Sequence, residues 1–431
     1  MNRKIKLSEI VKIAGRVGWK GYTVDDLREE GPWVIGANDI TTDNRLDLSK
    51  AKHISREKYE ESPEIKIELN DILIVKVGST IGKVAIINRD IGEACINPNS
   101  VILKNCKINS SYLYYFLISS AGQAFLRNNS SASAQSALNQ LTLKEMLIDL
   151  VDEQSQENIS ALLNNLNSKI ELNNRINAEL EAMAKTLYDY WFVQFEFPIE
   201  AAIAAKMGDP NLIGQPYKTS GGKMVWNEEL RREIPEGWEV KKVREIATTG
   251  SGSTPLKSNK EYYLNGNIPW INSGELNDPF IIEAKKYITQ LGMNSSSTKL
   301  FKRGTLLIAM YGATAGKVSI LDIEACTNQA ICSINLHNSS HRNYLKLVLD
   351  DLYEYLINLS TGSARDNLSQ DKIKELVVLM PNGLSIKKFD KIIEPMYAKI
   401  LNAYRENQKL TELRDWLLPM LMNGQVKVSE R

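Results

Sequence analysis

The stretch NDILIVKVGSTIGKV (residues 70–84) recurs in the second half of the chain as RGTLLIAMYGATAGKV (residues 303–318). Each copy is a β-rich apolar run that leads into a loop with two glycines and a lysine. A phosphate-binding P-loop needs four residues between its glycines and a Ser or Thr after the lysine. Here three residues separate the glycines, and Val84 or Val318 follows the lysine. The loop therefore lacks nucleotide-binding chemistry, and its repetition indicates an internal duplication.

Further segments of the first half recur in the same order in the second half, at offsets that run from 237 to 230 residues. The matched pairs are LSEI with VREI, PWVIGANDI with PWINSGEL, ACIN with ACTN, and SAQSALNQLTLKEM with SARDNLSQDKIKEL. The two copies, residues 1–150 and 236–381, read as short strands and turns, with a helical stretch SYLYYFLISSAGQAFL in the first. We expect each copy to be a compact α+β domain.

A long helical pattern follows each copy, at residues 151–197 and 382–431. Apolar positions recur in both with steps of 4, 3, 4, 3, 4, 3, 3 and 4 residues, which is coiled-coil spacing with one local stammer. The predicted seams are Ile159, Leu163, Leu166, Ile170, Asn173, Asn177, Leu180, Met183 and Leu187, and Phe389, Ile393, Met396, Ile400, Ala403, Asn407, Leu410, Leu413 and Leu417.

Polar features of the two helical segments predict how they pair. Asn177 and Asn407 occupy the same seam position, where a polar residue costs stability and fixes register. Residues 151–200 carry 3 Lys/Arg against 9 Asp/Glu, and residues 382–431 carry 9 against 6, so their net charges are −6 and +3. We expect the helices to pair antiparallel in a pseudo-twofold repeat, with the domains at opposite ends. Pro395 should kink the second helix or mark where its long segment begins.

Composition limits the class of protein. The chain has 431 residues and a net charge of +1, so any nucleic-acid contact must be local or shared with partners. Four cysteines without metal-ligand or disulfide spacing, and the absence of a long apolar segment, predict a cytoplasmic protein. The Gly- and Pro-containing residues 198–235 read as a connector that runs from ordered to flexible.

Taken together, the chain resembles the DNA-specificity subunits of type I restriction–modification enzymes. The resemblance covers nearly the whole chain. It is carried by the two glycine–lysine segments and by MAKTLYDYWFVQFEFP, GGKMVWNEELRREIPEGWEVKK and LRDWLLPMLMNGQVKV. No single segment is a chemical motif, but their order and duplication are specific.

The resemblance implies two target-recognition domains, each reading one half of a bipartite double-stranded DNA site, and two helices that hold them apart. It also implies partners. Two modification subunits would bring S-adenosylmethionine and adenine methylation, and restriction subunits would bring ATP- and magnesium-dependent translocation and cleavage. The chain itself would then bind no cofactor.

Two groups of loop residues are candidates for DNA contact. Hydroxyl and lysine side chains in the glycine–lysine loops suit phosphate contacts, although the loops could be plain hairpin turns. Polar side chains in the second group suit base contacts, although a solvated polar loop would have the same composition. The candidates are Ser79, Thr80, Lys83, Thr314 and Lys317, and Ser133, Gln135, Ser136, Asn139, Ser363, Arg365 and Asn367. Trp33 and Trp270 are expected to pack in or beside the cores.

Catalysis by the chain itself is poorly supported. The methyltransferase tetrapeptide (NPPY or DPPY) and a glycine-rich cofactor loop are absent, and the chain has only three histidines. His337 and His341 stand four residues apart without a third ligand nearby, so no metal site is predicted. Two alternatives to a recognition subunit remain at this point. One is a self-sufficient methyltransferase or nuclease, and the other is a coiled-coil scaffold that binds no nucleic acid.

Overall fold

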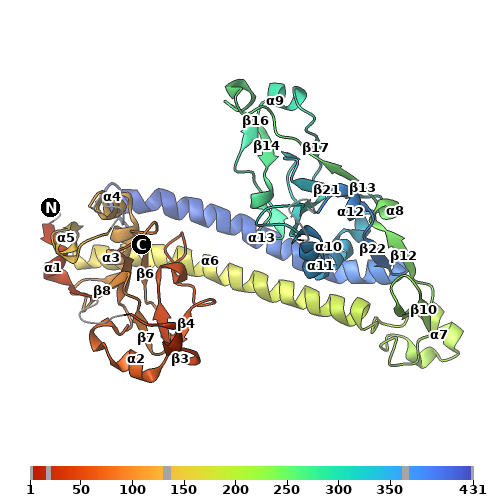
Figure 1. The fold of residues 1–431 in the computed structure, drawn as a ribbon, viewed down its shortest axis with the longest axis horizontal. Coiled ribbons are helices and arrows are strands. Elements are labelled where there is room, and N and C mark those ends of the chain that lie inside the picture. The colour runs from red at the N-terminus through yellow and green to blue at the C-terminus, as the bar shows by residue number, and fades with distance from the viewer. Residues whose placement is uncertain (1–2, 16–20, 130–136, 362–367, 429–431) are drawn as a thin grey trace. The chain divides into compact units, whose positions relative to one another are not determined.

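The computed structural model describes most of the chain, namely residues 3–15, 21–129, 137–361 and 368–428. The chain forms two compact units (Figure 1). The first contains Met1–Glu171 and Asn407–Arg431, and the second contains Leu172–Glu406. Within the described ranges, no helix combines the length and the apolar character that crossing a bilayer requires.

The first unit holds a four-stranded sheet of order β2-β8-β5-β6, a three-stranded sheet of order β4-β3-β7, and the pair β1-β9. Its strands are β1 (Arg3–Lys6), β2 (Lys12–Ala14), β3 (Leu27–Ile35), β4 (Lys52–Ile54), β5 (Ile72–Val75), β6 (Val84–Ile86), β7 (Ala94–Ile96), β8 (Ser100–Lys104) and β9 (Leu147–Leu150). Its short helices are α1 (Leu7–Ile10), α2 (Arg56–Glu60), α3 (Ser110–Ile118), α4 (Ser120–Asn128) and α5 (Gln140–Lys144).

The opening stretch of the sequence forms the middle of this unit. All four residues of β5 are buried, because both faces of its sheet are covered. Side chains alternate between the faces of a strand. Ile72 and Ile74 accordingly join the core under the helices, whereas Leu73 and Val75 join the core shared with the three-stranded sheet. A continuous apolar run is thus what a strand in a middle layer requires.

The second unit repeats this plan. Its sheets have the orders β13-β21-β18-β19-β15 and β16-β14-β20-β17, with the pairs β12-β22 and β10-β11. Its strands are β10 (Met224–Asn227), β11 (Arg232–Pro235), β12 (Glu239–Lys242), β13 (Ala247–Ser251), β14 (Ile268–Ile271), β15 (Phe280–Ile281), β16 (Tyr287–Ile288), β17 (Leu300–Phe301), β18 (Leu306–Ala309), β19 (Val318–Leu321), β20 (Ala325–Thr327), β21 (Ile331–Leu336) and β22 (Val377–Met380). Its short helices are α7 (Ala201–Met207), α8 (Val243–Ile246), α9 (Gln290–Asn294), α10 (Arg342–Asp351), α11 (Tyr353–Thr361) and α12 (Gln370–Lys374).

The duplication read from the sequence is therefore a duplication of topology. β14 pairs antiparallel with β16 and parallel with β20, as β3 pairs with β4 and β7. The strand β18 again sends Leu306 and Ile308 to one core and Leu307 and Ala309 to another. The predicted helical stretch in the first copy is two helices, α3 and α4, because Ser119 ends one and caps the other. The α+β prediction for both copies is confirmed.

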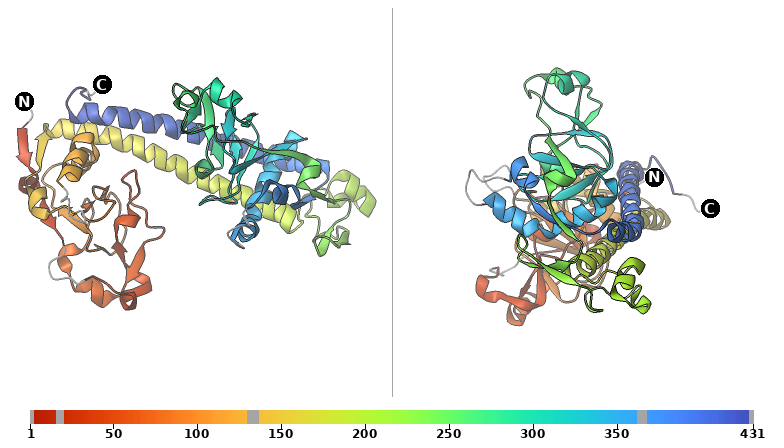
Figure 2. Two further views of the ribbon diagram at one scale, coloured as in Figure 1. Left: turned by 45° about the horizontal axis from the view of Figure 1, so that its top comes forward. Right: turned by 90° about the vertical axis from the view of Figure 1, so that its right-hand side faces the viewer.

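The two long helices are α6 (Glu153–Tyr188), continued by a π-turn at Asp189–Val193, and α13 (Gly383–Met422). Within each unit, stretches of the two helices lie side by side (Figure 2). In the first unit Arg414 donates to Asn167, and Leu163 shares a core with Leu421.

The second unit contains an equivalent helix pair. The amide of Asn173 donates to Glu406 at 2.7 Å, and the rings of Trp191 and Phe389 lie 5.7 Å apart. In both units, the sequence numbers of the contacting residues increase along α6 as they decrease along α13. The two helices therefore run antiparallel, and the predicted antiparallel pairing is confirmed. Pro395 lies inside α13, and the idea that it marks the start of that helix is wrong.

Most of the predicted seam is buried, but α13 departs from it after Ile400: Ala403, Asn407 and Leu410 are only partly buried and belong to neither core. Ile159, Leu163, Ile170, Phe389, Ile393 and Ile400 are buried, and Leu166, Leu180, Leu187, Met396 and Leu417 pack against the cores. Met183 and Leu413, the residues at the stammer, are 54% and 43% exposed. Ala184 is fully buried instead, so the steps continue as 3 and 4 without interruption. Met183 and Leu413 are therefore apolar residues beside the seam and not part of it.

One seam asparagine, Asn177, is buried without a hydrogen-bond partner for its side chain within the described ranges. Asn177 is 3% exposed, and neither atom of its amide has a hydrogen-bond partner within the described ranges. Leaving such a group unpaired costs about 1–3 kcal/mol. Asn407 is only partly buried. The two asparagines, although equivalent in sequence, therefore have different surroundings.

The connector at 198–235 is folded onto the second unit. Phe197 stacks on Tyr217 and Trp238, with ring centroids 4.6 and 4.9 Å apart. Ile199, Ala204 and Ile234 belong to the same core, and β10 and β11 form a hairpin. Aromatic residues thus tie down a segment whose Gly and Pro content predicted partial flexibility.

Candidate DNA interface

The two glycine–lysine loops are tight turns. Gly78 and Gly82 have φ angles of +92° and +88°, and Gly312 and Gly316 have φ angles of +93° and +81°. Residues other than glycine rarely adopt this left-handed region, so the backbone itself requires these glycines. Gly78 and Ser79 are exposed at the tip of the first loop, and Thr80 is partly buried. The tip is accessible to a ligand, but the glycines need no ligand to explain them.

The lysine of the first loop braces the domain from inside. The Nζ atom of Lys83 donates to the backbone oxygens of Ile40 at 2.6 Å and Ala37 at 3.3 Å. These oxygens belong to the turn that follows β3, more than 40 residues earlier in the chain. A phosphate contact by Lys83 stays a prediction. A phosphate bound there would share the Lys83 ammonium group with the carbonyls of Ala37 and Ile40.

The second loop is held in a similar way. Thr314 is buried, and its hydroxyl donates to the backbone oxygen of Ser273 at 2.8 Å. Lys317 donates to the side-chain oxygen of Asn277 at 3.0 Å. Both partners follow β14, which is the counterpart of β3. In each domain the loop therefore fastens the central sheet to the turn after the same strand of the other sheet.

The second group of candidates is only partly described. Ser133, Gln135, Ser136, Ser363, Arg365 and Asn367 lie outside the described residues. Asn139 is exposed, and its side-chain oxygen accepts the backbone N–H of Leu141 at 2.9 Å, which caps α5. Because this oxygen already accepts one hydrogen bond, Asn139 keeps its NH₂ group and one oxygen lone pair for a ligand.

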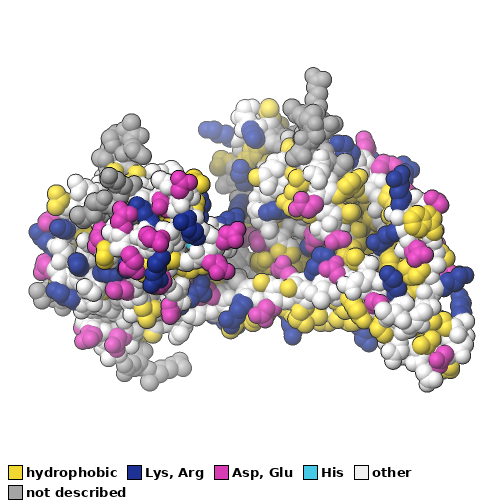
Figure 3. All heavy atoms as spheres, turned by 60° about the horizontal axis from the view of Figure 1, so that its bottom comes forward, with side chains coloured by type: hydrophobic (Ala, Val, Ile, Leu, Met, Phe, Trp, Pro, Cys, Tyr) yellow, Lys and Arg dark blue, Asp and Glu magenta, His cyan; other side chains and the backbone are white. Residues whose placement is uncertain are grey.

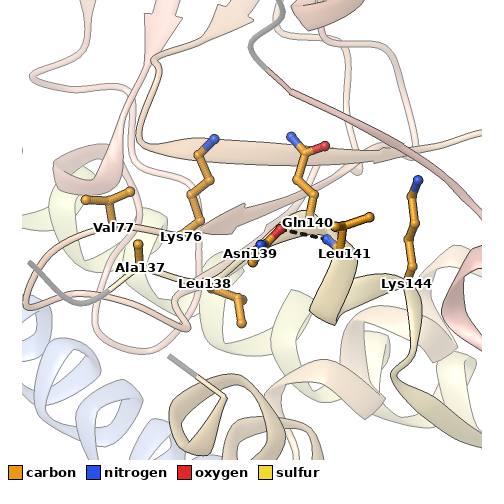
Figure 4. A pocket seen from close by; sticks show the side chains of 8 residues that line it. All are labelled: Lys76, Val77, Ala137, Leu138, Asn139, Gln140, Leu141 and Lys144. Atoms are coloured by element: carbon orange, nitrogen blue, oxygen red, sulfur yellow. Dashed lines mark hydrogen bonds between the residues drawn. The ribbon is translucent and has the colours of Figure 1, made fainter. Parts of the chain in front are cut away.

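The structure brings the first loop together with the end of the second candidate group. Val77 bridges to Ala137, and the N–H of Leu138 donates to the backbone oxygen of Lys76 at 2.8 Å. A groove of about 490 Å³ lies along this junction. The side chains that line it are shown in Figure 4: Lys76, Val77, Ala137, Leu138, Asn139, Gln140, Leu141 and Lys144.

The packing of the predicted tryptophans agrees with a structural role. Trp270 is 3% exposed, and its indole N–H donates to the backbone oxygen of Ser253 at 3.0 Å. Trp33 is partly buried, and its ring lies 3.7 Å from the ring of His53. Neither ring stands free for base stacking. Lys/Arg and Asp/Glu side chains are interspersed over the face drawn in Figure 3, so positive charge is not gathered in one large patch on that face.

A family model described as the type I restriction modification DNA specificity domain matches residues 3–182 and again residues 235–412. The two matches coincide with the two copies of the repeat, each extended into its long helix. The chain belongs to this family. It is a type I restriction–modification specificity subunit with two DNA recognition domains, and the alternatives of a lone enzyme and a scaffold are not favoured.

Relatives of the same kind align along most of their length. The MjaIX specificity subunit of Methanocaldococcus jannaschii is 25% identical over 437 residues, which cover 99% of this chain and 93% of that protein. The HindI specificity subunit of Haemophilus influenzae is 27% identical over 404 residues, covering 84% and 87%. A solved S subunit from M. genitalium has the same fold, with a TM-score of 0.55 at 16% identity over 97% of this chain and 95% of that chain.

Three polar residues of the groove in the first recognition domain were missed by the sequence analysis. Lys76 stands just before the first loop, and Gln140 and Lys144 stand just after the second candidate group. Loop composition points to residues within the loops, whereas the groove is built where these loops meet regular structure. A comparison of the two copies at position 76, where the second copy has Met310, would have pointed to Lys76.

The bracing role of Lys83 is open to direct measurement. Replacing Lys83 by Met removes the donor of two carbonyls, and each lost hydrogen bond of this kind costs about 1–3 kcal/mol. We expect the melting midpoint of the first domain to fall by roughly 2–10 °C in calorimetry. Lys144→Met, at an exposed position, should leave the midpoint within about 1 °C. An unchanged midpoint for Lys83→Met, together with weaker DNA binding, would identify Lys83 as a phosphate contact instead.

Proposed function

We propose that each recognition domain reads one half of a bipartite double-stranded DNA target and that the two long helices set the distance between the halves. The observation that carries this proposal is the duplicated domain topology, each copy joined to its own long helix. One chain with two versions of one reading domain suits a target with two different halves. The versions have diverged outside the shared framework, as two different half-sites require.

We further propose that this chain is not catalytic and that its partners supply the chemistry. The relatives are named as specificity subunits of restriction enzymes, so the reaction would fall to other subunits. Two modification subunits would carry S-adenosylmethionine and methylate adenine. Restriction subunits would use ATP and magnesium for translocation and cleavage. In this proposal the chain contributes the DNA sequence preference alone.

The exposed side of α6 supports docking of a modification subunit. Along α6 and the π-turn that continues it, apolar side chains between 38% and 54% exposed follow one another at steps of 4, 7, 7 and 3 residues: Leu172, Ile176, Met183, Tyr190 and Val193. A heptad-spaced apolar stripe beside an occupied seam is the surface onto which another helix packs. We assign this stripe to a modification subunit.

Exchange of one domain tests the division of labour. Residues 1–150 are replaced by the corresponding domain of another specificity subunit with a different target, and methylation is mapped in cells that express the modification subunits. Because the domains have separate cores, one half-site should change completely and the other should stay the same. A change in both half-sites would contradict independent reading. Failure of the unaltered complex to methylate any defined site would contradict the proposed function itself.

A change on the stripe tests the docking surface. Met183→Asp places a charge in the middle of the apolar stripe, and we expect binding of the modification subunit to weaken by about 2 kcal/mol or more, roughly 30-fold. Ala178→Asp is the matched control, since Ala178 is exposed on the opposite side of the same helix. Titration of modification subunit onto each purified chain gives the two affinities. Equal affinities for the two variants would remove the stripe from the interface.

A further inference from the structure

The groove of the first recognition domain presents three polar groups in a row. Lys76, Gln140 and Lys144 all line the groove, and their side chains extend to the same side in Figure 4. Gln140 and Lys144 are one turn apart on α5, about 5–6 Å between their Cβ atoms. An amide lies between two ammonium groups in this arrangement.

The backbone holds these groups in place. Lys76 and the segment before Gln140 are joined by the Leu138 N–H and by the bridge between Val77 and Ala137. Gly15 provides the space for Gln140, because a Cβ at Gly15 would lie 2.4 Å from the side-chain nitrogen of Gln140. Groups presented by a fixed backbone lose little entropy when they bind, which is what base reading requires.

Two of these side chains, Gln140 and Lys144, make no polar contact with their own domain within the described ranges. Within the described ranges, the Gln140 side chain has no hydrogen-bond partner and Lys144 has no ion-pair partner. The neighbouring Glu145 pairs with Lys6 at 2.6 Å instead. The groove therefore offers an unoccupied amide and an unoccupied ammonium group on one accessible surface.

In the second domain the equivalent glutamine already has a hydrogen-bond partner. Gln370, the counterpart of Gln140, donates to the hydroxyl of Thr249 at 2.9 Å. The strand pairing puts Ile13 at the position of Thr249, so the hydroxyl that Gln370 uses has no counterpart on β2.

The counterparts of Lys144 and Lys76 in the second domain are also less available to a ligand. Lys374, the counterpart of Lys144, pairs with Asp371 at 3.2 Å, whereas Leu141 stands at that position in the first domain. The counterpart of Lys76 is the buried Met310. Thus the second domain pairs the counterparts of Gln140 and Lys144 and replaces Lys76 by an apolar residue.

We propose that Lys76, Gln140 and Lys144 are a DNA-reading contact present in the first recognition domain only. The amide of Gln140 pairs with the edge of an adenine in the major groove, where glutamine matches the adjacent donor and acceptor. Lys76 and Lys144 hold the phosphates on either side. This inference rests on the proposed function and specifies which residues of the first domain determine its half-site.

The test uses the full complex with its modification subunits, methylation mapping and DNA-binding measurements. Gln140→Ala should make one position of one half-site degenerate, with discrimination there reduced roughly 5- to 150-fold. Gln140→Glu, nearly the same size, should also lose adenine at that position because a carboxylate cannot donate. The matched variant Gln370→Ala should leave both half-sites unchanged.

The lysines are tested by the salt dependence of binding. Lys76→Met, which copies the second domain, and Lys144→Ala should each weaken binding to all sequences and lower the salt slope by about one unit. An unchanged target for both Gln140 variants together with an unchanged salt slope would overturn the inference. Because the second half-site is still read in that case, the outcome is distinct from failure of the proposed function.

Discussion

The apolar seam shared by α6 and α13 is the interaction on which both units depend. In the first unit Ile159, Leu163, Leu421 and Met422 complete the core beneath the central sheet. In the second, Ala184, Tyr188, Phe389, Ile393 and Ile400 do the same. Each fully buried Leu or Ile contributes about 1.5–3 kcal/mol. Without the seam, one face of each central sheet would lose part of its apolar cover, so each domain is stabilised by the helices.

Polar contacts fix each domain on the helix that follows it. In the first unit the hydroxyl of Tyr115 lies between Asn164 and Asn167 of α6, at 2.8 and 2.9 Å. In the second, Arg405 of α13 pairs with the buried Asp322. Apolar burial alone would allow the domain to shift along the helix. Directional hydrogen bonds and ion pairs define one position of the domain on the helix. The same framework is thus built twice, and the residues free to diverge are those at its surface grooves.

The framework could be predicted from the sequence because its signals are local and repeated. The runs ILIV and LLIA, the matched turns and the heptad steps of Leu163 and Ile170 each specify a strand, a turn or a helix face within a few residues. The stammer at Met183 was wrong because spacing alone cannot separate a seam from an apolar stripe beside it. Only burial distinguishes Met183 from Ala184, and burial depends on what packs there.

The site residues were harder to predict because their roles depend on distant partners. Lys83 is the residue type that binds phosphate, yet the carbonyls of Ala37 and Ile40 already occupy it. Gln140 and Gln370 are the same residue in aligned segments, and the difference between them lies in Thr249 or Ile13 on another strand. A comparison of two sequence copies finds changed residues, but it does not find an unchanged residue with changed surroundings.

We propose that the paired helices set the distance between the two DNA half-sites. This proposal is tested most directly by inserting seven residues into each helix, after Glu171 in α6 and after Glu406 in α13. One heptad in both strands of the pair preserves the seam within about 20° and lengthens it by about 10 Å. DNA rises about 3.4 Å per base pair. Methylation mapping should therefore find the same two half-sites with a spacer about three base pairs longer. An unchanged spacer in an active complex would mean that the helices do not set this distance.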